Sequence, residues 1–133
     1  MEQSERQNHS TKTDAQTCVL IVEDEPSARE ASELYLGRLG YCVATASNAA
    51  EALQQAATHA PDIAVCDWRL GDGPDGVEVA RQLQQRYKTP IVFVTAHPID
   101  ELREASEDIN VSRYLRKPIS LPTLAKTIAT VAG

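Results

Sequence analysis

The sequence predicts an α/β fold in which a doubly wound parallel sheet of five strands carries helices on both faces. Short apolar runs recur along the chain, and several are continuous rather than alternating. Continuous runs are typical of parallel strands that are buried on both faces. Segments with the apolar spacing of amphipathic helices lie between them. Five such strand–helix units, joined by right-handed crossovers, predict this arrangement.

The expected strands are the apolar, β-branched-rich runs at 18–22, 41–46, 62–66, 90–95 and 111–115. The first, third and fourth are the continuous ones, so we expect them to be covered on both faces.

The first two expected helices have clear start and stop signals. The first begins after Pro26 and ends near Gly40. Its spacing assigns one face to the apolar residues Ala28, Ala31, Leu34, Tyr35 and Leu39. The second begins at Asn48, which forms a capping box with Glu51.

The remaining three helices differ in their patterns. The third has apolar residues on one side between Val77 and Tyr87. The fourth, around 99–107, is short and acidic, and the fifth runs from Leu121 to Val131 with Pro122 in its first turn.

Composition and length limit the function classes. A chain of 133 residues with 42% hydrophobic content forms one domain with a real core, expected over 17–132. Residues 1–16 are polar and are expected to form a flexible tail without the apolar segment of a secretion signal. The net charge of −6 argues against nonspecific binding to nucleic acid or to a membrane surface. No apolar run approaches the roughly 20 residues of a membrane span.

The three cysteines lack metal-site spacing. Cys18, Cys42 and Cys66 lie in or beside apolar runs and include no CxxC pair. We interpret them as small buried hydrophobic residues in a reducing compartment, which places the protein in the cytoplasm.

Polar residues follow the expected strands, at the edge of a parallel sheet where ligands bind. Glu23 and Asp24 follow the first strand, Asp67 follows the third, Thr95 ends the fourth, and Lys117 follows the fifth. Carboxylates at such short distances repel one another, so the cluster needs a positive charge to balance it. Carboxylate oxygens suit Mg²⁺, and the pattern therefore predicts a magnesium site.

In these motifs the chain resembles the receiver domain of two-component response regulators. The matching segments are VEDEP around Glu23 and Asp24, DIAVCD ending at Asp67, VTA at Thr95, and YLRKP at Lys117–Pro118. They extend over about residues 17–132. The resemblance implies a flavodoxin-like sheet with the strand order 2-1-3-4-5, and a cis peptide bond before the proline, although the isomer does not follow from the sequence.

The resemblance also implies the chemistry. Asp67 would accept a phosphoryl group from the phosphohistidine of a sensor histidine kinase or a histidine phosphotransfer protein. Mg²⁺, or Mn²⁺ in its place, would be held by Asp24, Asp67 and the backbone carbonyl of Arg69, with Glu23 acting mainly through a metal-bound water. Lys117 would pair with Asp67. The protein would catalyse only its own phosphorylation and dephosphorylation, and so would not be an enzyme in the usual sense.

The implied switch involves residues beyond the acceptor. Thr95 would move towards the phosphoryl group, and Tyr114, three residues before the lysine, would turn inward with it. The surface of the fourth helix, fifth strand and fifth helix would change and regulate a downstream protein target, or form a homodimer. Arg69 and His97 are candidates for tuning the phosphoryl lifetime.

Other polar residues near the site are expected to be structural. Asp72 and Asp75, in LGDGPDG, are expected to form turns, and Glu25 is expected to be solvated.

Three alternatives remain open at this point. The chain is also compatible with a receiver excised from a larger hybrid kinase or transcription regulator. A Mg²⁺-dependent phosphohydrolase with an aspartyl nucleophile would be a different class, but such enzymes typically carry an aspartate where Arg69 stands. The third alternative is a pseudo-receiver that signals without phosphorylation. The intact set of acidic residues, threonine and lysine at the strand ends argues against it.

Overall fold

The computed structural model describes residues 17–133, and the expected tail at 1–16 lies outside this range. Its strands are β1 (Cys18–Val22), β2 (Cys42–Ala46), β3 (Ile63–Cys66), β4 (Ile91–Thr95) and β5 (Val111–Arg116). They pair in parallel in the order β2-β1-β3-β4-β5. The predicted fold class and strand order are confirmed.

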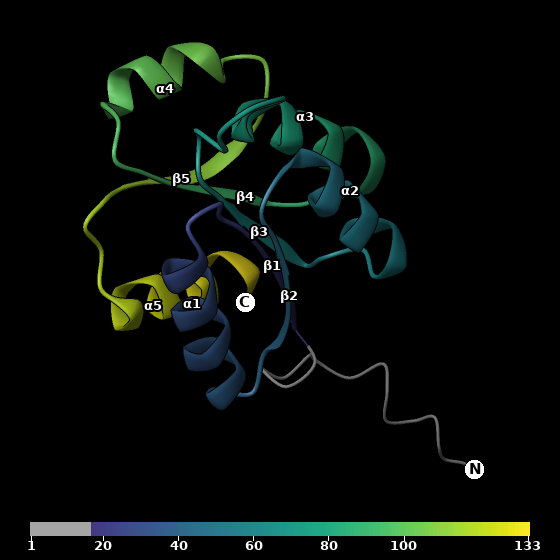
Figure 1. Cartoon of the computed structure of the whole chain (residues 1–133), viewed down its shortest axis with the longest axis vertical. Helices are drawn as coiled ribbons and strands as arrows, with labels where there is room; N and C mark the ends of the chain where they lie inside the picture. Colours follow the sequence, from purple (N-terminus) through teal and green to yellow (C-terminus); the bar gives the residue numbers. More distant parts are fainter. Residues whose placement is uncertain (1–16) are drawn as a thin grey trace.

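Five helices connect and follow the strands (Figure 1). They are α1 (Pro26–Arg38), α2 (Ala49–Thr58), α3 (Gly76–Tyr87), α4 (Ile99–Ala105) and α5 (Leu121–Ala132). The fourth helix is two residues shorter than the expected end at 107. Ser106 ends it by donating from its hydroxyl to the Leu102 carbonyl at 2.7 Å.

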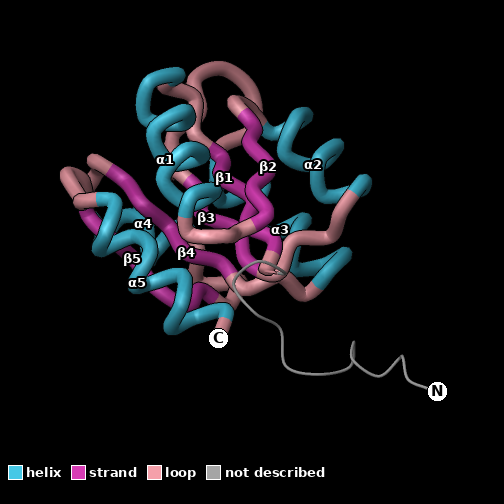
Figure 2. The backbone as a smooth tube through the Cα atoms, turned by 90° about the horizontal axis from the view of Figure 1, so that it is seen from below, coloured by secondary structure: helices cyan, strands magenta, loops and turns pink. Residues whose placement is uncertain are grey.

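The sheet separates two hydrophobic cores. Helices α1 and α5 lie together on one face, and α2 and α3 lie on the other (Figures 1 and 2). Alternate residues of β1 enter the two cores, with Leu20 and Val22 on the α2–α3 side and Val19 and Ile21 on the α1–α5 side. This burial on both faces explains the continuous apolar runs.

The predicted apolar face of α1 is partly wrong. Leu36 is fully buried, whereas Leu34 is 57% exposed and Leu39 is 46% exposed. Ser32, one turn before Leu36, is half-buried on the inward side. Tyr35 does pack against the same core as Leu36, so hydrophobicity alone misplaced the two leucines but not the whole face.

The helix caps follow from local sequence. The Asn48 side chain accepts from the Glu51 amide at 2.9 Å, which is one half of the predicted capping box. The Glu51 side chain accepts from the Ser47 amide at 2.7 Å and not from the Asn48 amide. Asp75 caps α3 by accepting from the amides of Val77 and Glu78, both at 3.1 Å. Asp75, which was expected to form a turn, is thus the N-cap of α3.

The cysteines do not share one environment. Cys66 is fully buried and Cys18 is partly buried, but Cys42 is exposed, so its predicted burial is wrong. Cys42 is the first residue of β2, which is one of the two edge strands of the sheet, and its side chain is exposed there.

None of the helices formed by residues 17–133 has the length and apolar character needed to cross a membrane.

Gly76 brings the start of α3 against the end of β3. Its amide donates to the Trp68 carbonyl at 2.6 Å. A Cβ atom at this position would lie 1.8 Å from the Asp67 carbonyl oxygen, which no side chain tolerates. The missing side chain of Gly76 therefore sets the distance between α3 and the backbone of Asp67.

We predict that Gly76→Ala lowers the free energy of unfolding by about 2–3 kcal/mol, because backbone must move to admit the new methyl group. Gly37→Ala is the matched control. Nothing lies within 4 Å of its added Cβ, and Ala in a helix interior is favoured over Gly by about 0.5–1 kcal/mol. Urea unfolding of both variants checks the prediction, and equal effects at the two positions would contradict it.

Candidate functional site

The polar residues predicted at the strand ends meet at one edge of the sheet. Carboxylate oxygens of Glu23, Asp24 and Asp67 all lie within 4.8 Å of one another. The Lys117 ammonium lies among them, with Nζ 2.8 Å from Glu23 Oε1 and 2.9 Å from Asp67 Oδ2. The structure thus brings together four of the five predicted strand-end residues in direct contact or near contact.

Lys117 directly follows edge strand β5, and its side chain extends to the carboxylates at the ends of β1 and β3. Its amide donates to the Thr95 carbonyl at 2.8 Å, which continues the pairing of β5 with β4. The Lys117–Pro118 peptide bond is cis, as the resemblance implies. Burial opposes the charged ammonium, but hydrogen bonds and charge from Glu23 and Asp67 outweigh burial and raise the Lys117 pKa.

Three adjacent acids follow β1, and each has a different environment. Glu23 is 8% exposed, and its Oε2 accepts from the Glu25 amide at 3.0 Å. Asp24 is exposed beside it. Glu25 is the N-cap of α1, and its side chain accepts from the Ala28 amide at 2.7 Å. The expectation that Glu25 is merely solvated is therefore wrong.

Protein groups partly compensate these acids. Lys117 and a backbone amide each contact Glu23, and Arg29 donates to the Glu23 carbonyl at 2.9 Å. The N-terminus of α1 adds the positive end of a helix dipole beside Glu25. Both carboxylate oxygens of Glu23 already accept hydrogen bonds, whereas Asp24 is open to solvent.

The donor set of the acidic cluster fits a divalent cation. Three carboxylates converge on one point, and hard oxygen ligands of this kind suit Mg²⁺. The backbone carbonyl of Arg69, expected as a further ligand, follows Asp67 by two residues in the loop towards α3.

Thr95 is completely buried at the end of β4, and its Oγ1 accepts from the His97 amide at 3.1 Å. Thr95 belongs to the same edge as the acids through the Thr95–Lys117 backbone hydrogen bond.

Trp68 joins the two residues predicted to tune the site. The guanidinium carbon of Arg69 lies 4.0 Å from the centre of the Trp68 ring, and the ring of His97 meets Trp68 edge-on at 5.8 Å. Trp68 is 5% exposed. Within the described part of the chain its buried Nε1 has no hydrogen-bond partner. Sequence reasoning missed Trp68, although a lone aromatic residue directly after Asp67 was a usable signal.

Tyr114 is already half-buried and held by three contacts, so the structure does not show the exposed starting position from which it was expected to turn inward. Its ring stacks on buried Phe93 with centroids 6.0 Å apart. Its hydroxyl and the Ser106 hydroxyl are 2.7 Å apart, and the Arg103 guanidinium lies 4.6 Å from the ring centre. Ser106 and Arg103 were not predicted, because only the folded chain places the end of α4 beside β5.

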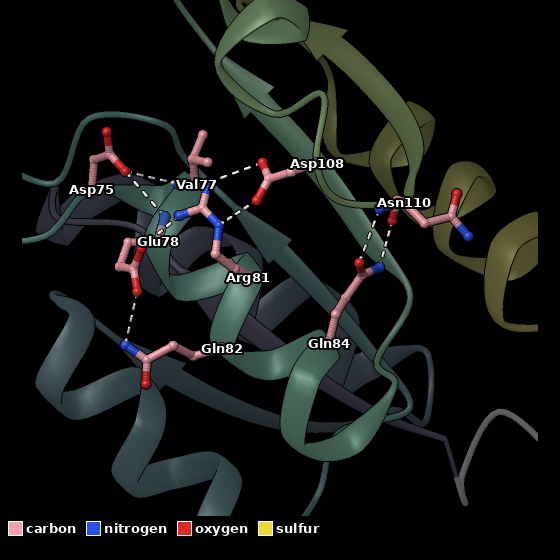
Figure 3. Close-up of polar contacts among 8 residues, drawn as sticks. All are labelled: Asp75, Val77, Glu78, Arg81, Gln82, Gln84, Asp108 and Asn110. Carbon is pink, nitrogen blue, oxygen red and sulfur yellow. Dashed lines mark hydrogen bonds and ion pairs between the residues drawn. The ribbon is translucent and has the colours of Figure 1, made fainter.

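Helix α3 is fastened to the loop between α4 and β5 (Figure 3). Arg81 binds Asp108 through two hydrogen bonds of 2.6 and 3.0 Å. Gln84 accepts from the Asn110 amide at 3.0 Å and donates to the carbonyl of the same residue. Asp108, one of the acids around α4, therefore pairs with α3, and hydrogen bonds from Arg81 are the main cause of its lowered pKa.

Comparisons with known proteins agree with this geometry. The family described as the response regulator receiver domain matches residues 19–129. The chain is a response regulator receiver domain. Its relatives include the response regulator protein PilR from Pseudomonas aeruginosa, 34% identical over 112 residues that cover 84% of this chain and 25% of PilR.

A second relative is the positive alginate biosynthesis regulatory protein from the same species. It is 40% identical over 114 residues, which cover 83% of this chain and 45% of the relative. The receiver domain thus spans between a quarter and a half of the length of these two relatives.

Solved structures show the same fold. The chemotaxis protein CheY4 from Vibrio cholerae has a TM-score of 0.80 at 30% identity, with 86% of this chain and 98% of CheY4 covered. The receiver domain of a modulated diguanylate cyclase from Desulfovibrio desulfuricans has a TM-score of 0.78 at 35% identity, with 86% and 92% covered.

We predict that Lys117→Met destabilises the receiver domain by about 1–3 kcal/mol without Mg²⁺, because buried Glu23 loses its charged partner. Added Mg²⁺ then raises the melting temperature more in the variant than in the wild type, because the cation meets less competition for the carboxylates. Lys126→Met, at an exposed position of α5, is the control. An equal Mg²⁺ response in all three proteins would contradict the prediction.

Proposed function

We propose that this receiver domain is a phosphorylation-dependent signalling switch that accepts a phosphoryl group on Asp67. The donor would be the phosphohistidine of a sensor histidine kinase or of a histidine phosphotransfer protein. The observation that carries the proposal is the contact of Asp67 with Lys117 inside a cluster of two further carboxylates at the carboxyl edge of the sheet.

Each of the clustered residues would have a separate role in phosphoryl transfer. A carboxylate oxygen of Asp67 attacks phosphorus in line with the leaving nitrogen of the donor imidazole, giving an acyl phosphate. Asp24, Asp67 and the carbonyl of Arg69 would hold Mg²⁺, or Mn²⁺, with Glu23 oriented towards a bound water. The bound cation would supply charge neutralisation for the phosphoryl oxygens.

Lys117 supports the acceptor before and after transfer. Its ammonium already lies 2.9 Å from Asp67 Oδ2, so it needs only a small movement to contact a phosphoryl oxygen. Thr95 lies at the neighbouring strand end and would turn its hydroxyl towards another phosphoryl oxygen, giving up the His97 amide.

The output would be read at α4, β5 and α5. Tyr114 is already packed on Phe93 and bonded to Ser106, so its ring is positioned to follow any change at buried Thr95. A downstream protein would recognise the altered surface, or a second copy of the domain would do so. A role within a larger regulator is supported by the greater length of the relatives.

The geometry gives less support to a phosphohydrolase. The residue two positions after Asp67 is Arg69, whose side chain packs over Trp68 and lies 3.9 Å from Asp75. It offers no second carboxylate to act on a leaving group.

We predict that acetyl phosphate with Mg²⁺ adds one phosphoryl group, about 80 Da, to the wild type, measured as intact mass. Asp67→Asn should show no adduct, and chelation of the metal should abolish the adduct on the wild type. Asp72→Asn, at an exposed position in the loop that follows Asp67, should be labelled normally. An adduct that persists on Asp67→Asn would show that another residue is the acceptor.

We predict that Tyr114→Ala uncouples phosphorylation from the output surface. Beryllofluoride should still bind, because Tyr114 lies outside the acidic cluster. The amide NMR shifts that it induces in α4 and β5 should shrink relative to the wild type. Tyr87→Ala is an aromatic control on α3, and shifts of unchanged size in Tyr114→Ala would argue against the switch.

A further inference from the structure

Two cysteine side chains lie together at the end of the sheet opposite the acidic cluster. Cys18 is the first residue of β1 and Cys42 is the first residue of β2. Their Cα atoms are register partners in the parallel β1–β2 pair. Both side chains are on the face of the sheet that carries Leu20 and Ala44, since side chains alternate along a strand.

The strand pairing places the Cα atoms of this pair within the range seen in disulfides. Neighbouring strands lie about 4.7–4.9 Å apart, and disulfide-bonded cysteines have Cα atoms about 4.4–6.8 Å apart. Cys18 and Cys42 also line one cavity of about 270 Å³ with Ala56 and His59 of the α2 region. Because register partners on one face of a parallel pair project in the same direction, the two thiols lie side by side.

Backbone contacts hold both residues in place. The Cys42 amide donates to the Thr17 carbonyl at 3.0 Å, and the Cys18 amide donates to Asp62 Oδ2 at 2.7 Å. The ends of the two strands are therefore fixed beside each other before any bond forms.

The third cysteine has a contrasting environment. Cys66 is fully buried at the end of β3. Cys42 is exposed and Cys18 is partly exposed. Because thiol oxidation requires access and a thiolate, the pair is open to an oxidant and Cys66 is protected.

We propose that Cys18 and Cys42 are a redox modification site that forms a reversible intramolecular disulfide when the protein meets hydrogen peroxide. The exposed Cys42 thiolate attacks the peroxide oxygen, which breaks the O–O bond, releases one water and leaves a sulfenic acid. The Cys18 thiolate then attacks the Cys42 sulfur and releases a second water. Two thiols lose two electrons and two protons, and one peroxide becomes two waters.

The Cys18–Cys42 disulfide would constrain the edge of the sheet and would not contact the acidic cluster. Glu23 and Asp24 lie just beyond the other end of β1. A bond between Cys18 and Cys42 encloses α1 in a covalent loop and ties edge strand β2 to β1. Oxidation should therefore make the domain more resistant to heat, because cross-linking restricts the unfolded chain.

The test treats the purified domain with hydrogen peroxide, blocks remaining thiols with iodoacetamide and measures intact mass. We expect one blocked thiol instead of three after denaturation, and a mass about 2 Da below that of the reduced chain before blocking. Dithiothreitol should restore all three thiols. A product that keeps three thiols, or that forms only dimers through Cys42, would overturn the proposal.

Peptide mapping identifies the linked residues. No lysine or arginine separates Cys42 from Cys66, so trypsin leaves them in one peptide. Cleavage at Glu51 and Asp62 separates them. The linked peptides should contain Cys18 and Cys42, whereas a link that involves Cys66 would contradict the assignment.

Variants connect the bond to the stability change. Cys42→Ser and Cys18→Ser should each abolish the bond and the peroxide-induced rise in melting temperature. Cys42→Ser is at an exposed position and should fold normally, so it decides the test if Cys18→Ser does not fold. A rise that persists in Cys42→Ser would overturn the proposal.

Discussion

The ammonium of Lys117, which lies between Glu23 and Asp67, is the interaction on which the carboxyl edge of the sheet depends. The strand order places the ends of β1 and β3 side by side, so three carboxylates fall within 4.8 Å. Repulsion among them would oppose folding without a cation. Lys117 extends from β5 across the end of β4 to reach them. A phosphoryl group would enter a site where positive charge is already in place.

Helix α3 connects this edge to the rest of the domain. Its first residue, Gly76, touches the backbone of Asp67 and Trp68, and its middle binds the loop that contains Asp108 and Asn110. The same loop begins at Ser106, which bonds Tyr114. The strand that ends at Asp67 and the surface of α4 and β5 are therefore linked through α3 as well as through Thr95.

Much of this architecture was predictable from the sequence, because parallel strands covered on both faces leave continuous apolar runs. The meeting of Glu23, Asp24, Asp67 and Lys117 was predictable because these side chains directly follow those runs. The buried face of α1 was not, since Ser32 faces inward and Leu34 faces outward. The exposure of Cys42 depends on β2 being an edge strand, which only the assembled sheet decides. The contacts of Trp68 and of Ser106 likewise depend on loops that meet only in the folded chain.

Trp68 gives the domain a natural optical label. It is the only tryptophan in the sequence, it follows Asp67 directly, and its ring is held between a guanidinium and an imidazole. Indole emission depends on nearby charge and on hydrogen bonding at Nε1, which has no partner among the described residues. The indole fluorescence of this protein, excited selectively over its four tyrosines, therefore comes from one known point beside Asp67, and its wavelength and intensity report that microenvironment without any added dye.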